Sequence, residues 1–265
     1  MFDALYIGAT GMQAQQLHVD TIANNLANVN TPGFKKGRVS FTDLMMSETS
    51  RLAPAGADQA VPNLLGAAMG TGAGVGVNAL AKLFEPGALN PTGSSWDLAI
   101  EGDGFLEVQM PDGATAFSRG GAMKVNADGT LASQSGHAFK PGITIPATAT
   151  SVTVAPDGAV SVTTPQQPKP TQVGQLQVVR FANPMGLLAQ GDNLYRSSDA
   201  SGEPMAGHAG QEGIGSLRQG FLEASNVKMV DEMVNLMVAQ RAYQASVKVV
   251  QASDELLGMV NNLRR

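Results

Sequence analysis

Proline and glycine are unevenly distributed along this chain, and their positions restrict where long helices can form. All 14 prolines lie between Pro32 and Gly220. The last 45 residues contain a single glycine, Gly258. Proline removes a backbone donor, and glycine costs about 1 kcal/mol in a helix interior. The sequence therefore predicts one long helix at each end of the chain and a different kind of structure between them.

Apolar residues recur at seven-residue spacing in both terminal segments, a pattern typical of helices that pair along a seam. In the N-terminal segment, Leu5, Met12, Val19 and Leu26 recur at this spacing, and Ile22 follows Val19 by three places. The C-terminal set is Met229, Leu236, Tyr243, Val250 and Leu257. We expect these ten residues to form the helix interface and to take part in self-assembly. The two terminal helices should pair in a coiled-coil-like arrangement.

The C-terminal segment also shows where its helix starts and which other surfaces it presents. Ser225 and Asn226 offer N-cap oxygens before the periodic run. Small residues three places after the heptad positions favour close approach of another backbone. Further apolar residues such as Met233 and Met237 widen the apolar face beyond a narrow seam. This face either packs on the central domain or is covered by other copies of the chain.

The central part contains short strand-like runs separated by turn signals. Asp-Gly pairs separate 105–110 from 116–119, 123–126 from 131–133, and 151–155 from 160–163. Asp-Gly between such runs predicts β-hairpins, because both residues tolerate positive φ. Further strands are expected at 97–101, 143–145 and 176–181. Pro165, Pro168 and Pro170 predict an extended connection instead of a strand.

These patterns together predict an α+β fold with a central antiparallel β domain. The expected divisions are residues 1–30 for the N-terminal helix, 31–84 for a connector and extended loop, 85–215 for the β domain, and 216–265 for a connector and the C-terminal helix. Residues 46–77 show no clear period and predict a long loop that orders on contact with a neighbouring molecule.

The sequence shows no pattern typical of a catalytic, cofactor or metal site. There is no cysteine, so disulfides and cysteine-ligated metals are excluded, and the three histidines are widely separated. The alternating glycines from Gly70 to Gly76 lack the spacing of a dinucleotide fingerprint and are interpreted as a connector. We therefore expect no catalytic site, cofactor or metal. A secreted β-domain enzyme or binding module remains only a remote alternative.

Charge also limits the choice of partners. The formal net charge is −5 and charged residues make up 15% of the chain, which argues against nucleic acid as a partner. Lys35, Lys36 and Arg38 form the one tight basic cluster. It is read as a solvated turn, with anion binding as the alternative. The N-terminus lacks the pattern of a cleaved secretory signal.

Several stretches resemble the bacterial flagellar rod and hook proteins. The N-terminal motif consists of Asn24, Asn25, Leu26 and Asn28, followed by Thr31, Gly33, Phe34 and Lys35. The closing segment is similar to that of the family through Asn226, Arg241 and Tyr243. The stretches 97–105, 117–121 and 220–223 also match. Physically, 31–34 suits a type II turn with glycine at its third position, and the motif asparagines could bond across subunits.

The resemblance implies a structural subunit that polymerises helically into a hollow axial tube. It favours the distal rod, a drive shaft that transmits torque through the periplasm, with a proximal rod or hook subunit as the alternative. The implied partners are other copies of the chain, other rod proteins, the hook subunit, the periplasmic and outer-membrane ring proteins and the flagellar export apparatus. Export would occur without a cleaved signal peptide.

Overall fold

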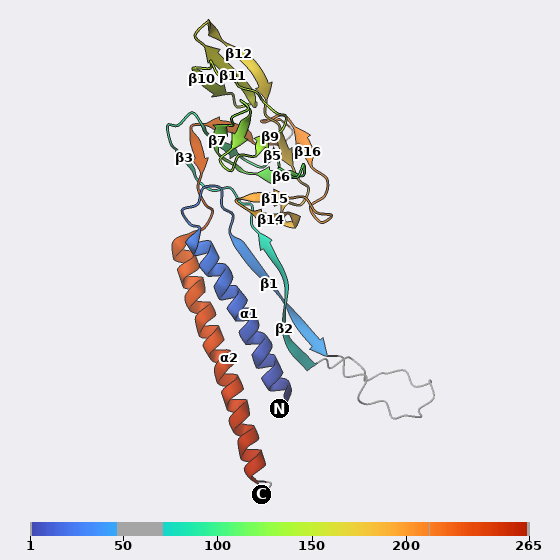
Figure 1. Ribbon diagram of the computed structural model, residues 1–265. Coiled ribbons are helices and arrows are strands. Elements are labelled where there is room, and N and C mark those ends of the chain that lie inside the picture. Colours follow the sequence, from blue (N-terminus) through green and yellow to red (C-terminus); the bar gives the residue numbers. More distant parts are fainter. Residues whose placement is uncertain (1, 47–70, 212, 264–265) are drawn as a thin grey trace, which may run out of the picture. The chain divides into compact units, whose positions relative to one another are not determined.

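The computed structural model describes residues 2–46, 71–211 and 213–263 (Figure 1). The chain divides into two compact units. We call Met1–Leu26, Gly37–Ala81 and Met229–Arg265 the helical unit, and Ala27–Lys36 with Lys82–Lys228 the β unit. Both units are therefore built from segments that are distant in the sequence.

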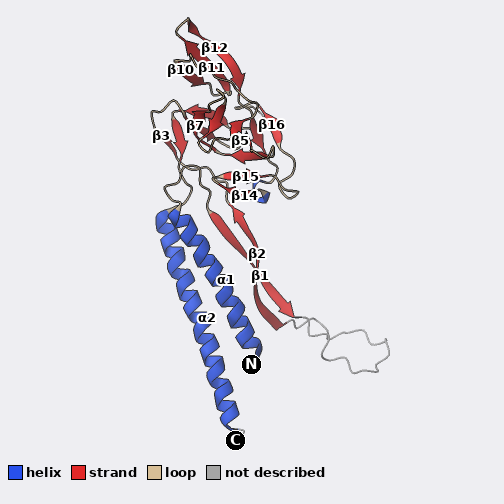
Figure 2. Cartoon of the chain, in the orientation of Figure 1, coloured by secondary structure: helices blue, strands red, loops and turns tan. Residues whose placement is uncertain are grey.

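The helical unit contains the two predicted terminal helices, which lie side by side (Figures 1 and 2). Helix α1 spans Phe2–Ala27 and α2 spans Met229–Leu263. Gly8 marks a close approach of the two helices, since a Cβ added there would lie 2.6 Å from Val250 Cγ2. The prediction of one long helix at each end is confirmed.

A two-stranded sheet completes the helical unit and corrects the expectation for the connector. Strands β1 (Gly37–Met46) and β2 (Thr71–Lys82) pair with each other, so Gly72, Gly74 and Gly76 belong to a strand. Gly74 has a φ of +114°, and a Cβ at this position would meet Thr10 of α1. Glycine therefore lets β2 approach the helix closely. Of the predicted long loop, residues 47–70 lie outside the described residues.

The β unit is antiparallel, as predicted. An 11-stranded sheet has the main order β14-β15-β6-β5-β9-β8-β7-β4-β17, with β13 and β16 extending from β5. A second sheet has the order β10-β11-β12, and β3 pairs with β18. The strands are β3 (Leu89–Pro91), β4 (Asp97–Glu101), β5 (Phe105–Gln109), β6 (Thr115–Ser118), β7 (Gly120–Val125), β8 (Leu131–Ser133), β9 (Ala138–Phe139), β10 (Ser151–Val154), β11 (Ala159–Thr164), β12 (Gln167–Gln175), β13 (Val178–Arg180), β14 (Leu188–Gly191), β15 (Leu194–Arg196), β16 (Met205–Gly207), β17 (Ser216–Gln219) and β18 (Phe221–Glu223).

All three Asp-Gly hairpins are confirmed. Strands β5 and β6, β7 and β8, and β10 and β11 pair across the turns. The turn glycines Gly113, Gly129 and Gly158 have φ values of +81°, +75° and +90°. A residue with a Cβ is strained in that region, which explains why these turns carry glycine.

Three local expectations are corrected. Residues 143–145 form no strand but a single bridge, between Thr144 and Thr130, and the strand expected at 176–181 is limited to Val178–Arg180. Strand β12 includes Pro168 and Pro170, where an extended connection was expected. These prolines are tolerated because β12 is an edge strand of its sheet. On one side of an edge strand, the backbone N–H groups have no neighbouring strand to bond to.

The β unit also reaches further along the chain than the expected end at residue 215. Strand β17 pairs with β4, and β18 pairs with β3. Leu217 of β17 is buried in the main core beside Leu98 and Ile100. Residues 216–223 thus belong to the β unit, before the chain enters α2.

A second, smaller core consists largely of aromatic side chains, among them Phe105, Phe117 and Tyr195.

Candidate functional site

One face of α2 exposes apolar side chains over its first three turns. Their exposed fractions range from 47% at Val234 to 73% at Val230. We call this set the apolar stripe: Met229, Val230, Met233, Val234, Met237 and Val238. The small residues Ala239 and Ser253 are buried on another face of the same helix. Helix α2 therefore has both a buried seam and an uncovered apolar surface, as a subunit that is covered by neighbouring molecules would have.

The predicted interface residues differ in their burial within one chain. Ile22 is buried, while Met229 and Tyr243 are exposed. The others are half-buried: Leu5, Met12, Val19, Leu26, Leu236, Val250 and Leu257. Their role in self-assembly stays a prediction.

The motif that follows α1 forms the predicted turn. The N–H of Phe34 donates to the carbonyl oxygen of Thr31 at 3.2 Å, and Gly33 has a φ of +70°. The hydroxyl of Thr31 donates to Oδ1 of Asn28 at 3.2 Å. Phe34 is buried and its ring lies 4.3 Å from the ammonium of Lys82. The turn therefore directs the chain and places Lys35 in the interior.

Asn25 is one of the motif asparagines that could bond across subunits, and its side chain bonds within the chain. Its Oδ1 accepts the N–H of Gly37 at 2.7 Å, and its Nδ2 donates to the carbonyl of Gly37 at 2.9 Å. Nδ2 also lies 3.2 Å from Oε2 of Glu232 on α2. Asn25 is 2% exposed, and it joins α1, β1 and α2 within the helical unit.

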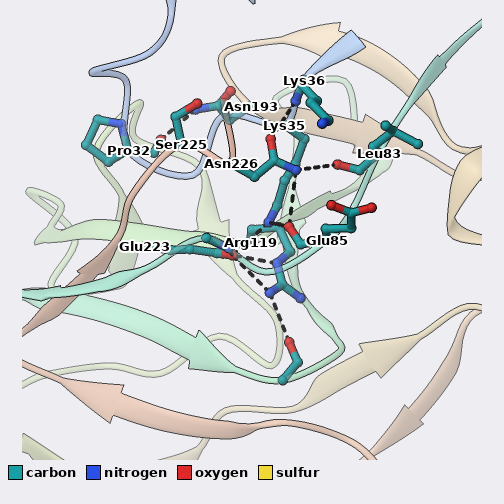
Figure 3. Close-up of polar contacts among 12 residues, drawn as sticks. Pro32, Lys35, Lys36, Leu83, Glu85, Arg119, Asn193, Glu223, Ser225 and Asn226 are labelled. Atoms are coloured by element: carbon teal, nitrogen blue, oxygen red, sulfur yellow. Dashed lines mark hydrogen bonds and ion pairs between the residues drawn. The ribbon is translucent and has the colours of Figure 1, made fainter. Parts of the chain in front are cut away.

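The interpretation of the basic cluster as a solvated turn is wrong for Lys35, which is fully buried in an ion triad with Glu223 and Arg119 (Figure 3). Nζ of Lys35 lies 2.7 Å from Oε1 of Glu223. Nε of Arg119 lies 3.2 Å from Oε2 of the same carboxylate. Arg119 also donates to the carbonyls of Gly104 and Gly102, at 2.7 and 2.9 Å. The triad is therefore tightly bonded as well as charge-paired.

The triad shifts the pKa values of its own members. Burial lowers the pKa of Lys35 below its usual 10.5, although the negative charge of Glu223 opposes this. For Glu223, burial acts to raise the pKa, but the charges of Arg119 and Lys35 outweigh it and hold the pKa below 4.5. Glu223 is therefore held in its ionised form, as the anion between two cations.

Asn226 does not cap α2, which corrects a further expectation. Its Oδ1 accepts the N–H of Lys36 at 2.8 Å. Its Nδ2 donates to the carbonyls of Leu83 and Glu85, at 2.8 and 3.2 Å. Helix α2 begins three residues later, at Met229. The amide is instead used to bridge segments of the β unit.

Burial also sets the ionisation of Tyr195, which packs against the ring of Phe84 at 4.9 Å. Burial raises its pKa to about 12. The stability that this contributes is fully present below about pH 10, the pKa of an unfolded tyrosine, and is lost as the pH rises toward about 12. Between pH 8 and pH 11, we expect the wild-type chain to lose about 1.4 kcal/mol more stability than Tyr195→Phe. Urea unfolding at both pH values measures this, and parallel losses in the two proteins would contradict it.

Among the described residues, no three histidine, aspartate or glutamate side chains gather as a metal site would require. No described helix combines the length and apolarity needed to cross a membrane.

Three regions of the chain match models of known protein families. Residues 5–35 match the model of the flagella basal body rod protein. Residues 99–162 match the flagellar hook protein FlgE/F/G D1 domain, and residues 218–263 match the flagellar basal body rod FlgEFG protein C-terminal region. Each region contains one member of the ion triad, Lys35, Arg119 or Glu223.

Full-length relatives are also found. The flagellar basal-body rod protein FlgG of Borreliella burgdorferi is 43% identical, with all of both chains covered. The FlgG protein of Bacillus subtilis is 38% identical, again over both whole chains. The flagellar basal-body rod protein FlgF of Caulobacter vibrioides is 34% identical, covering 97% of this chain and 95% of the relative.

The chain has a pair of terminal helices with an uncovered apolar stripe, and an antiparallel β unit. The matches show that this is the architecture of an axial flagellar protein. The chain belongs to the flagellar basal-body rod protein family. It is a structural subunit of the flagellar rod.

Proposed function

We propose that this chain polymerises helically into the distal part of the flagellar rod, a hollow drive shaft that transmits torque through the periplasm. The apolar stripe on α2 is the observation that supports the proposal. Six large apolar side chains exposed on adjacent turns are unfavourable in a solitary protein and are stabilised when copies of the chain cover them. The full-length relatives named FlgG favour the distal position, and the lower identity to FlgF keeps a proximal rod subunit as the alternative.

In this proposal the terminal helices form the inner layer of the tube. Within one chain, α1 and α2 approach closely at Gly8, and the buried seam of α2 carries Ala239 and Ser253. The pair would form a coiled-coil-like element, and the heptad residues would continue into contacts between subunits. The β unit would contact neighbouring subunits and the ring proteins. Other rod proteins, the hook subunit and the export apparatus would be further partners.

Polymerisation can be tested with the full chain. Purified protein, concentrated and imaged by electron microscopy, is expected to form straight tubes, and circular dichroism should show helix content rising as assembly proceeds. The wild-type gene should restore motility to cells of the source organism whose own copy has been deleted. A protein that stays monomeric at every concentration, and a deletion strain with complete rods, would together refute the proposal.

A further inference from the structure

The connections between the two units are concentrated in three short segments of the β unit. The chain passes from one unit to the other four times, at residues 26/27, 36/37, 81/82 and 228/229. We call 27–36, 82–88 and 221–228 the anchor segments, because together they carry all four crossings. Whatever the arrangement of the units, a force acting between them passes at least partly through these covalent connections.

Backbone hydrogen bonds join each anchor segment to the other two. The N–H of Gly33 donates to the carbonyl of Glu223 at 2.8 Å, which links the first segment to the third. The N–H of Leu83 donates to the carbonyl of Lys36 at 3.0 Å, which links the second to the first. The N–H of Ala224 donates to the carbonyl of Ala88 at 2.8 Å and completes the set.

Side chains strengthen the same links (Figure 3). Lys35 of the first segment donates to the carbonyl of Glu85 at 2.8 Å as well as to Glu223. Oε1 of Glu223 also accepts the N–H of Gly87 at 2.8 Å. Asn226 of the third segment bonds to both of the others, through Lys36 and Leu83. Two side chains of the third segment and one of the first thus contact every anchor segment.

Arg119 fastens these contacts to the main sheet. It lies between β6 and β7 and donates both to Glu223 and to the carbonyls of Gly102 and Gly104, which lie between β4 and β5. Arg119 is 2% exposed. The charge-assisted bonds are therefore shielded from water and salt, which would weaken them at a surface.

We infer that Lys35, Arg119, Glu223 and Asn226 form a clamp that holds the three anchor segments together, so that torsional load entering at one crossing is shared by all four and by the main sheet. This inference rests on the proposed function as a torque-transmitting rod subunit. A clamp differs from a residue that only adds stability, because its loss should loosen all three anchor segments together while distant strands keep their protection.

Hydrogen exchange of the full-length chain tests this directly. Lys35→Met keeps the Arg119–Glu223 pair and removes the bonds to Glu85 and Glu223, so the β unit should still fold. We expect exchange of the Gly33, Leu83 and Ala224 amides, one in each anchor segment, to rise together by at least about tenfold. The matched control is Lys36→Met, because Lys36 joins the network through its backbone N–H, which methionine retains.

A rise confined to one anchor segment would overturn the inference, and so would an equal rise in strands β10 and β11. The second variant is Asn226→Asp, which keeps the acceptor for Lys36 and removes the donors to Leu83 and Glu85. The same pattern is expected for it, and it takes the place of Lys35→Met if that variant does not fold.

Motility under load separates the clamp from the proposed function. In deletion cells carrying each variant, we expect Lys35→Met to assemble rods, to swim like wild type in dilute medium, and to lose speed or break rods as viscosity rises. Lys36→Met should behave as wild type throughout. Assembled Lys35→Met rods that perform normally at the highest load would overturn the clamp alone. A wild-type chain that fails to form rods would instead refute the proposed function.

Discussion

Replacing Glu223 with glutamine is expected to destabilise the β unit by about 3–5 kcal/mol, because it leaves Lys35 and Arg119 as buried cations without their counter-charge. The glutamine side chain is similar in size, so a cavity contributes little. Both cations are nearly inaccessible to water, with side-chain exposures of 0% for Lys35 and 2% for Arg119. Solvent therefore cannot replace the lost carboxylate.

Urea unfolding followed by tryptophan fluorescence measures this loss. Trp96 is the single tryptophan of the chain and lies in the β unit, so the signal reports on the unit that contains the triad. The control is Glu107→Gln, because Glu107 pairs with Lys140, whose side chain is 53% exposed. Exposed pairs contribute about 0–1 kcal/mol. Equal losses in the two variants would contradict the importance of burial.

A double variant sharpens the interpretation. Combining Glu223→Gln with Lys35→Met removes one of the two unpaired cations. We therefore expect it to be at least about 1 kcal/mol more stable than the sum of the single effects implies. Additive losses would show that the two side chains act independently, despite the 2.7 Å between Nζ of Lys35 and Oε1 of Glu223.

The elements that the sequence predicted well depend on local signals. The Asp-Gly turns at Gly113, Gly129 and Gly158 need a positive φ that glycine supplies, so a few residues suffice to place each hairpin. The terminal helices are marked by periodicity and by the absence of proline. The resemblance to the rod and hook proteins rests on equally local motifs, and it was confirmed by the full-length relatives.

The features that were missed depend on residues far apart in the chain. Lys35 is 188 residues from Glu223, its partner in the triad, and no local pattern distinguishes a lysine that is buried from one that is solvated. The glycines of β2 were interpreted as a connector. The reason for glycine at position 74 is the close approach of this residue to Thr10 of α1, and Thr10 is far away in the sequence. Asn226 looked like a helix cap because its partners, Lys36 and Leu83, lie in other segments.

Strand β12 shows a third reason for error. Pro168 and Pro170 argue against a strand when neighbours are unknown, because proline cannot donate to a ladder. The objection disappears at the edge of a sheet, and β12 is an edge strand. Whether a proline is tolerated thus depends on strand order, which the local sequence does not encode.

Replacing Met237 with aspartate is expected to abolish assembly while leaving the single chain folded. Met237 belongs to the apolar stripe and is 55% exposed, so the change disturbs little within the chain. The cost to the monomer is limited to helix propensity, at most about 0.7 kcal/mol. In a polymer that covers the stripe, the carboxylate would be buried without a partner, at a cost of several kcal/mol.

The critical concentration for polymerisation, followed by light scattering, should therefore rise at least about a hundredfold, since each 1.4 kcal/mol corresponds to a factor of ten. The matched control is Gln244→Asp. Gln244 is exposed and lies seven residues after Met237, so it is on the same face of α2 but outside the apolar stripe. It should polymerise close to normally, because the aspartate replaces a side chain that is already polar. Normal polymers from Met237→Asp would show that the apolar stripe is not a contact between subunits, and equal loss in both variants would show that any added charge on this face prevents assembly.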